Sequence, residues 1–123
     1  MAEIAGARVQ VFLPITRDGD REAAESFVAH VRGQYGGETH SSFDPPAYHG
    51  FWTEGKGSEI FHDEIVLLQI DFAAARLDDG TFRADLNTLR RAAFDAYAAA
   101  NASQEEIWLT VQTTHILLGD TTQ

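Results

Sequence analysis

The sequence predicts an α+β fold in which a four-stranded antiparallel sheet carries two helices on one face. Two observations predict this class. Segments with the two-residue apolar period of strands lie near both ends of the chain and in its middle. Two segments with the three- and four-residue apolar spacing of helices separate them. The expected order of elements is therefore β-α-β-β-α-β.

The first strand is expected from Arg8 to Ile15, where every second residue is aliphatic and one face should be buried. The turn that follows contains Asp18 and Asp20, either of which can cap a helix. This helix is expected to reach about Tyr35, because its apolar positions recur at spacings of three and four. The glycine pair at 36–37 should end it.

The segment from Thr39 to Thr53 has the aromatic content of a strand, but it contains Pro45-Pro46. Two consecutive prolines leave two ladder donors missing, so this segment should be an edge strand or a loop leading into one. A turn at 54–58 joins it to the longest strand signal, which runs from Glu59 to Phe72. Together the two segments predict a hairpin.

The turn at 78–81 precedes a second helix, expected from about Arg83 to Asn101 and rich in alanine, a good helix former. The last strand is expected from Glu106 to Leu117, where apolar and polar residues alternate. A chain of 123 residues can bury one core of its own. Residues 1–123 should therefore form a single domain.

The alternation within the strands assigns each residue to one face of the sheet. The face toward the helices should carry Val9, Val11, Leu13, Val66, Leu68, Ile70, Ile107, Leu109 and Val111. The open face should carry Gln10, Phe12, Ile65, Leu67, Gln69, Trp108, Thr110 and Gln112. About half of this open face is apolar, which favours burial against a second copy. The sequence therefore predicts a homodimer packed through the open sheet faces.

The composition excludes several classes of protein. The chain has no cysteine, which rules out disulfides, thiolate metal sites and cysteine nucleophiles. Its net charge is −10 and its cations are scattered, so nucleic acid and anionic membranes are not expected as partners. It shows neither a secretory signal nor a run of about 18 apolar residues. We expect an acidic cytoplasmic protein.

The segment from His40 to Glu64 is the most promising place for a chemical site. It holds three of the five histidines, interleaved with large aromatic residues instead of segregated by face. On an extended strand His62 and Glu64 share one side, with His49 across the hairpin. The candidate ligand-binding residues are His40, His49, Trp52, His62 and Glu64. The chain has no phosphate loop, HExxH motif, EF-hand loop or nucleophile elbow.

Two kinds of chemistry fit this set of residues. Two imidazoles and a carboxylate suit zinc, nickel or iron. Without a metal, a histidine oriented by Asp63 or Glu64 can abstract a proton from a carbon acid or a phenol. The structural alternative is a solvated hairpin whose aromatic residues pack against a helix or a partner chain. We expect no cofactor and no stoichiometric transition metal, and the sequence does not identify a small-molecule ligand.

Three short motifs carry a resemblance to a known class of domain. They are Gly50-Phe51-Trp52, the run from Glu64 to Leu68, and Gln104 to Trp108 after the second helix. With them, the chain from about Arg8 to His115 resembles small bacterial ferredoxin-like domains of uncharacterised function. The resemblance implies a ferredoxin-like βαββαβ fold with strand order 4-1-3-2, and no activity comes with it.

The sequence thus favours a homodimeric binding or interaction module. The alternative is a small cofactor-free or metal-dependent enzyme of the dimeric ferredoxin-like type, which would use the histidine and carboxylate residues of the central hairpin. The two alternatives make different structural demands. An enzyme should bring at least two of the candidate side chains within hydrogen-bond or metal reach in a concave pocket, whereas a module leaves them in solvent.

Overall fold

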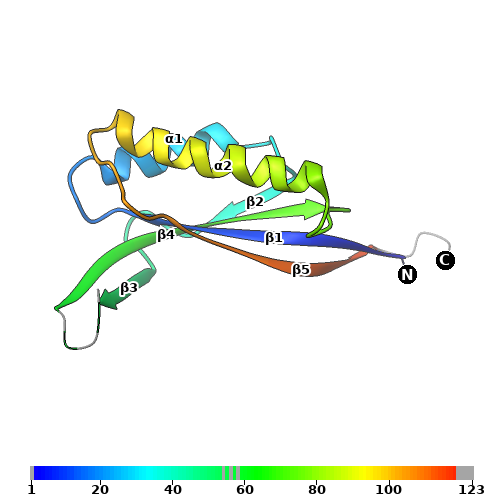
Figure 1. The fold of residues 1–123 in the computed structure, drawn as a ribbon, viewed down its shortest axis with the longest axis horizontal. Coiled ribbons are helices and arrows are strands. Elements are labelled where there is room, and N and C mark those ends of the chain that lie inside the picture. Colours follow the sequence, from blue (N-terminus) through cyan, green and yellow to red (C-terminus); the bar gives the residue numbers. More distant parts are fainter. Residues whose placement is uncertain (1, 54, 56, 58, 119–123) are drawn as a thin grey trace.

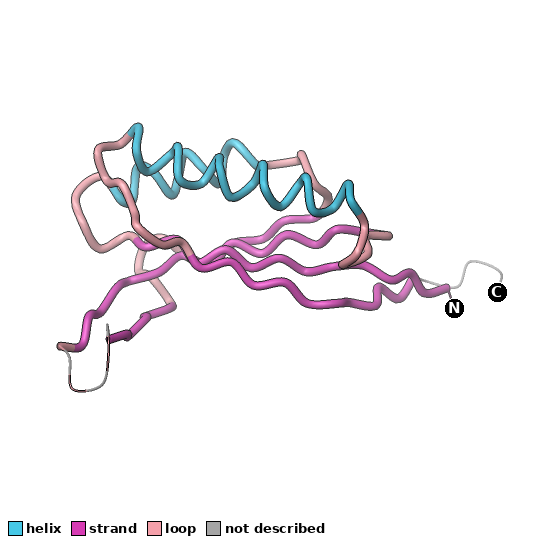
Figure 2. Tube along the Cα trace, in the orientation of Figure 1, coloured by secondary structure: helices cyan, strands magenta, loops and turns pink. Residues whose placement is uncertain are grey.

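The structure is a computed structural model that describes residues 2–53, 55, 57 and 59–118. Its elements, in chain order, are β1 (Ala2–Pro14), α1 (Asp20–Val31), β2 (Gly37–His40), β3 (Tyr48–Thr53), β4 (Ile60–Ala73), α2 (Gly80–Ala99) and β5 (Trp108–Leu118). All strand pairs are antiparallel. Both helices cover the same face of the sheet and leave the other face open (Figures 1 and 2). The predicted α+β class is confirmed.

The strand count and order differ from the prediction. The described sheet has five strands in place of four, with the order β2-β4-β1-β5 and with β3 paired to β4 beside that path. β2 pairs with residues 68–71 of β4, and β3 pairs with residues 60–65 of the same strand. The segment predicted as one edge strand or loop therefore forms two strands. Pro45-Pro46 explains the break, because proline cannot donate to the ladder.

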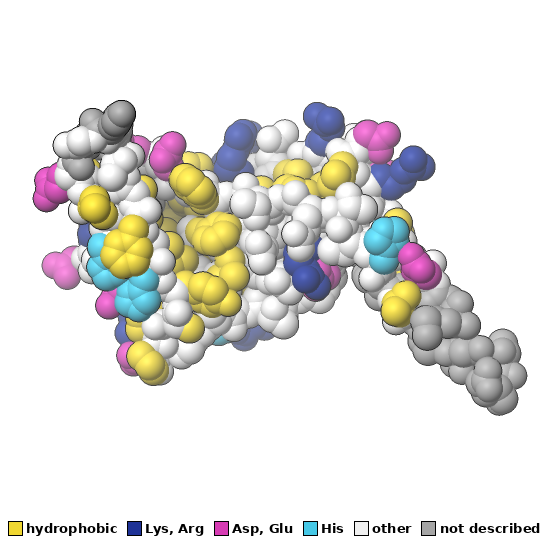
Figure 3. Space-filling model, turned by 90° about the horizontal axis from the view of Figure 1, so that it is seen from below, with side chains coloured by type: hydrophobic (Ala, Val, Ile, Leu, Met, Phe, Trp, Pro, Cys, Tyr) yellow, Lys and Arg dark blue, Asp and Glu magenta, His cyan; other side chains and the backbone are white. Residues whose placement is uncertain are grey.

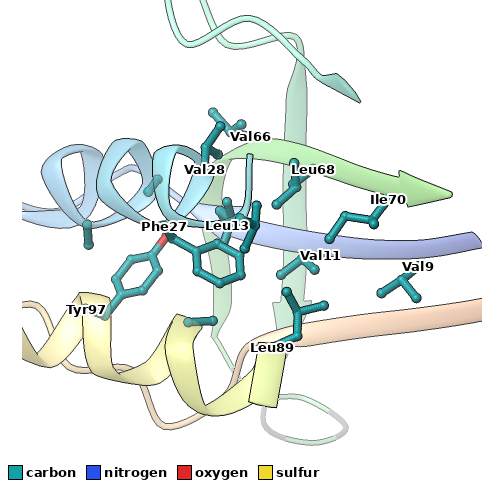
Figure 4. Close-up of a cluster of buried hydrophobic side chains, with 14 of the residues drawn as sticks. Val9, Val11, Leu13, Phe27, Val28, Val66, Leu68, Ile70, Leu89 and Tyr97 are labelled. Carbon is teal, nitrogen blue, oxygen red and sulfur yellow. The ribbon is translucent and has the colours of Figure 1, made fainter. Parts of the chain in front are cut away.

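The hydrophobic core lies between the helices and the sheet (Figure 4). The predicted helix-facing residues of β1 and β4 are all buried; Ile107, just before β5, and Leu109 and Val111 within it are partly buried and pack against them. Phe27 of α1 and Tyr97 and Leu89 of α2 are the largest fully buried side chains of the helix layer. The predicted assignment of faces is thus confirmed.

The strand β1 begins at Ala2, well before its predicted start at Arg8, because it pairs with β5 as far as Leu118. The turn predicted at 54–58 falls partly outside the described residues. Among the described residues, neither helix combines the length with the apolar composition that crossing a membrane requires.

The ends of α1 differ from those predicted. Gly19, in the left-handed conformation, is the N-cap residue, and no side chain caps this helix. The capping role expected for Asp18 or Asp20 is therefore wrong, and the side chain of Asp20 is instead fully buried. The helix ends at Val31, earlier than the predicted Tyr35.

The second helix begins earlier than expected. It starts at Gly80 instead of Arg83, because the Asp79 carboxylate accepts a hydrogen bond from the backbone N–H of Thr81 at 2.7 Å. This bond satisfies one of the free amides at the helix start.

Tyr97 ties α2 to the end of β1. Its side chain is fully buried, and its hydroxyl donates a hydrogen bond of 2.7 Å to the carbonyl oxygen of Pro14. Burial, and then the nearby negative charges of Asp20 and Asp63, raise the pKa of Tyr97 well above its ordinary value. The phenol therefore stays neutral in the folded protein at a pH where the unfolded chain ionises.

Replacing Tyr97 with phenylalanine should change how stability depends on pH. Because the pKa is raised in the folded state, wild-type stability is complete below pH ~10 and falls as the pH rises above it. Tyr97→Phe should lose about 1 kcal/mol at pH 7, because the Pro14 carbonyl loses its donor. The variant should also lose much less stability than the wild type as the pH rises above about 10.

Urea denaturation between pH 7 and 11 measures both effects. Tyr48→Phe is the control, since the ring of Tyr48 is about half exposed. This control should keep the wild-type pH dependence. A Tyr97→Phe protein that loses stability above pH 10 as steeply as wild type would contradict the assignment.

Candidate functional site

The strand β3 and the start of β4 form a two-stranded arm, which we define as residues 48–53 and 60–65. The pairing of β1 with β4 begins only at Ile65, and Ile15 adds one backbone hydrogen bond to Glu64, so in the described structure residues 60–63 pair with β3 alone. Figure 1 shows the arm bending away from the helices, toward the open side of the sheet. A two-stranded ribbon in water is at best marginally stable. Its cross-strand side-chain contacts therefore determine how firmly the arm is held.

The arm brings His49 and His62 together. Nδ1 of His49 lies 2.8 Å from Nε2 of His62, with the ring centroids 5.1 Å apart and the ring planes 14° apart. The centroid separation exceeds the N···N distance by about two imidazole radii, so the rings lie end to end in nearly one plane. This is the geometry of an N–H···N hydrogen bond, in which one nitrogen carries the proton and the other accepts it. We call these two residues the imidazole pair.

Phe51 supports the imidazole pair from one side. Its ring stacks on that of His62, with centroids 4.7 Å apart and planes 16° apart. Phe51 lies directly opposite His62 in the strand register, and His49 lies directly opposite Glu64. Opposite residues of an antiparallel pair point to the same face, so all four share one face of the arm. Phe51 is 67% exposed, so this face does not pack on the core.

His40 lies apart from the other two candidate histidines. It ends β2, its Nδ1 lies 2.7 Å from the carbonyl oxygen of Ser41, and its ring meets Phe43 edge to face. Within the described residues, no hydrogen bond or ring contact joins His40 to His49 or His62. The structure therefore assembles two of the three predicted histidines.

Glu64 shares the face of the imidazole pair, but its backbone makes its contacts. Its N–H donates to Oγ1 of Thr16 at 2.7 Å, and its carbonyl oxygen accepts from the N–H of Ile15 at 2.8 Å. In the described part of the chain, no three His, Cys, Asp or Glu side chains are arranged to hold a metal ion. The mutual hydrogen bond also engages the two imidazole nitrogens that face each other. This donor set does not fit the metal-binding alternative considered for these residues.

Trp52 lies on the other face of the arm, opposite Phe61, while Tyr48 lies opposite Ile65 on that same face. A Cβ atom built on Gly50 would lie 2.8 Å from Cζ3 of Trp52 and 2.6 Å from Cδ1 of Ile65. The indole thus lies over Gly50, close to Ile65, and glycine permits this close approach. Trp52 does not join the imidazole pair.

The open sheet face carries a row of apolar side chains across three strands. Phe12 of β1 lies opposite Leu67 of β4 and opposite Trp108 of β5. Alternate residues of β4 continue this row onto the Trp52 face of the arm. We call the combined surface the apolar strip; its members are Phe12, Tyr48, Trp52, Phe61, Ile65, Leu67 and Trp108. Figure 3 looks onto this side and shows apolar side chains gathered over the sheet and on the arm.

The rest of the open face is polar. Arg8 and Asp71 form an ion pair at 2.8 Å, and Gln10 bonds Gln69. The open-face positions expected at Gln10, Phe12, Leu67, Gln69, Trp108, Thr110 and Gln112 are partly or largely exposed, whereas Ile65 is buried. The sequence predicts only Trp52 of this strip as a candidate site residue, while Tyr48 and Phe61 are among the hairpin aromatics expected to line a pocket or to pack against a helix or a partner chain. Their places in the arm register, which the sequence alone does not determine, connect them to the strip.

A separate groove of about 320 Å³ lies between the two helices. It is lined by Ser26, Phe27, His30, Ala92, Asp95 and Ala96, and so by none of the candidate residues. The imidazole pair, in contrast, is exposed on the arm. An active site was expected to bring two candidate side chains within hydrogen-bond reach in a concave pocket. The imidazole pair meets the first condition, but it does not lie in this groove.

Comparison with known proteins adds no assignment, since no protein-family model, curated protein or solved structure matches the chain.

Proposed function

We propose that the protein is a homodimeric interaction module whose two copies associate through the open sheet face and the arm. The observation that carries the proposal is the apolar strip. Its aromatic residues Tyr48, Trp52, Phe61 and Trp108 are each at least 40% exposed. Contiguous exposed apolar surface of this kind marks an interaction site. Aromatic side chains are also enriched at such interfaces.

The bent arm favours a second copy as the occupant. Because the arm bends toward the open side, two copies with opposed open faces, related by a two-fold axis parallel to the sheet and across its strands, would let each arm close over the other copy. On the sheet itself, the charges of the open face can be covered as a pair, since Arg8 and Asp71 already neutralise each other. On the arm, the interface would also contain the carboxylate of Asp63, which shares the face of Trp52.

The proposal includes a ferredoxin-like relationship for the fold. If β2 and β3 are taken as one strand interrupted by residues 41–47, the element order becomes β-α-β-β-α-β. Both parts lie on the same side of β4, which supports this interpretation.

Replacing Trp108 with aspartate should separate the proposed dimer. A carboxylate at this position would be desolvated in the interface, and a two-fold interface contains the substitution twice. We expect the dissociation constant to rise at least about 30-fold, as for the loss of an aromatic anchor. Sedimentation equilibrium at micromolar concentration measures it.

Leu77→Asp is the matched control for this experiment. Leu77 is an exposed apolar residue, as Trp108 is, but it lies in the turn before α2 and outside the apolar strip. It should leave the dissociation constant unchanged. A wild-type protein that sediments as a monomer at micromolar concentration would overturn the proposal.

A second candidate function, that of a small enzyme, is favoured by the imidazole pair. Two hydrogen-bonded imidazoles can take up a proton at one end and release one at the other, as acid-base chemistry requires. The outer nitrogens would be Nε2 of His49 and Nδ1 of His62. Both rings are exposed, so water would have to be excluded by the partner copy. The interaction module remains our leading proposal, because the apolar strip favours association by itself, whereas catalysis would also require that water be excluded from the two exposed rings.

A further inference from the structure

The imidazole pair has three protonation states with different geometries. In the neutral pair, one of the two facing nitrogens holds the proton and the other accepts it across 2.8 Å. A first added proton keeps this contact, because a protonated imidazole can still donate to a neutral one. A second added proton places an N–H group on both facing nitrogens, so the contact becomes repulsive. The geometry described here is therefore compatible with at most one added proton.

The arm depends on contacts of this kind. In the described structure, residues 60–63 pair only with β3, and Glu64 at the base of the arm also bonds Ile15 and Thr16, so the arm beyond its base lacks the support of a third strand. One face of the arm holds Trp52 and Phe61, and the other holds the imidazole pair with Phe51 stacked on it. Loss of the pair would remove the only side-chain hydrogen bond that joins β3 to β4 among the described residues.

Few other charges surround the pair. On its face of the arm, Glu64 is the other titratable residue, while Tyr48 and Asp63 lie on the opposite face. The loop after β1 contributes the uncharged Thr16. Among the described residues, no carboxylate forms an ion pair with either ring. A second positive charge on the pair therefore has no described ion-pair partner.

We infer that the imidazole pair makes the arm pH-sensitive: the arm is held while the pair shares a proton and loosens when both rings are protonated. Histidine side chains change charge between about pH 5 and 8, so acidification through that range should drive the transition. A second consequence rests on the proposed function. Because the arm contributes to the proposed interface, acidification should also weaken the dimer.

Nitrogen NMR of the histidine rings in the full chain tests the pair directly. At pH 7.5 one of the two facing nitrogens should be protonated and the other not, with scalar coupling between them. At pH 5 both should be protonated and the coupling should vanish. His30, on α1, has no histidine partner among the described residues and should show no such coupling at either pH.

Hydrogen exchange of the β3 amides tests the effect on the arm. After correction for the intrinsic rate, exchange should be at least about fivefold faster at pH 5 than at pH 7.5. His62→Gln removes the pair and should exchange at the fast rate at both pH values. His115→Gln is the matched control, since it removes the His115–Glu3 ion pair at the other end of the sheet. It should keep the pH dependence of the wild type.

Two results would overturn the inference: exchange that does not depend on pH in wild type, or a pH dependence that survives in His62→Gln. Sedimentation at both pH values then tests the link to association, with a dissociation constant expected to be at least about fivefold higher at pH 5. A monomer at both pH values would refute the proposed dimer, and the NMR result would still decide the inference about the arm. A dimer of equal affinity after loss of the coupling would refute the link.

Discussion

Asp20→Ala should lower the free energy of unfolding by about 3 kcal/mol, because it leaves partly buried donors without their acceptor. The Asp20 side chain is fully buried. Its carboxylate accepts from the backbone N–H of Arg17 at 2.9 Å and from Nε2 of Gln104 at 3.0 Å. These bonds join the loop before α1 to the connection between α2 and β5. The substitution would weaken both attachments at once.

Urea denaturation of Asp20→Ala and of a neighbouring control measures this loss. Asp18→Ala is the matched control, because Asp18 is exposed, and it should change stability by less than about 0.5 kcal/mol. Asp20→Asn keeps the size of the side chain and one acceptor oxygen, so it should be less destabilising than alanine. Equal stabilities of Asp20→Ala and Asp18→Ala would show that the buried carboxylate does not hold these segments.

Gly19→Ala should cost about 3 kcal/mol or more, because two separate penalties add. The residue has φ +85°, a conformation that costs an L-residue about 1–2 kcal/mol. A Cβ atom there would also lie 2.5 Å from the carbonyl oxygen of Ala100. This oxygen belongs to the backbone at the end of α2, so no side-chain rotation can relieve the contact. The two helices would have to separate slightly to accept the methyl group.

Gly33→Ala separates the two penalties. Gly33 also has a positive φ, of +74°, but nothing lies within 4 Å of a Cβ atom at this position. It should therefore cost only the conformational part, about 1 kcal/mol. Thermal or urea unfolding of both variants gives the comparison. If the two substitutions lower the free energy of unfolding by the same amount, the close approach of Gly19 to Ala100 does not contribute to the loss.

The faces of the sheet could be predicted from the sequence because burial follows the two-residue period of a strand. Val9, Val11 and Leu13 are buried as expected, and Trp108 is exposed on the open face. The outer edge could not be predicted in the same detail. Pro45-Pro46 indicated an interruption and the turn at 54–58 indicated a hairpin, but no local signal showed that residues 37–40 would pair with β4 as a separate strand.

The candidate site was predicted in part for a similar reason. The two-residue period placed His62 and Glu64 on one side of a strand, and they do share a face. Which β3 residue lies opposite each of them depends on the register of the hairpin, which spacing along one strand does not give. His40 was grouped with the other histidines by its nearness in sequence. The loop at 41–47 instead places its ring against Phe43.

The division of the outer strand also makes the two borders of the sheet unequal. On the β4 side the border consists of β2, with 4 residues, and β3, with 6, set apart by the proline-containing loop. On the other side, β5 ends the described sheet with 11 continuous residues. Short, interrupted edge strands are poor templates for unwanted edge-to-edge polymerisation. Protection against such polymerisation is therefore built into one border by the prolines, whereas β5 presents the long border of the sheet.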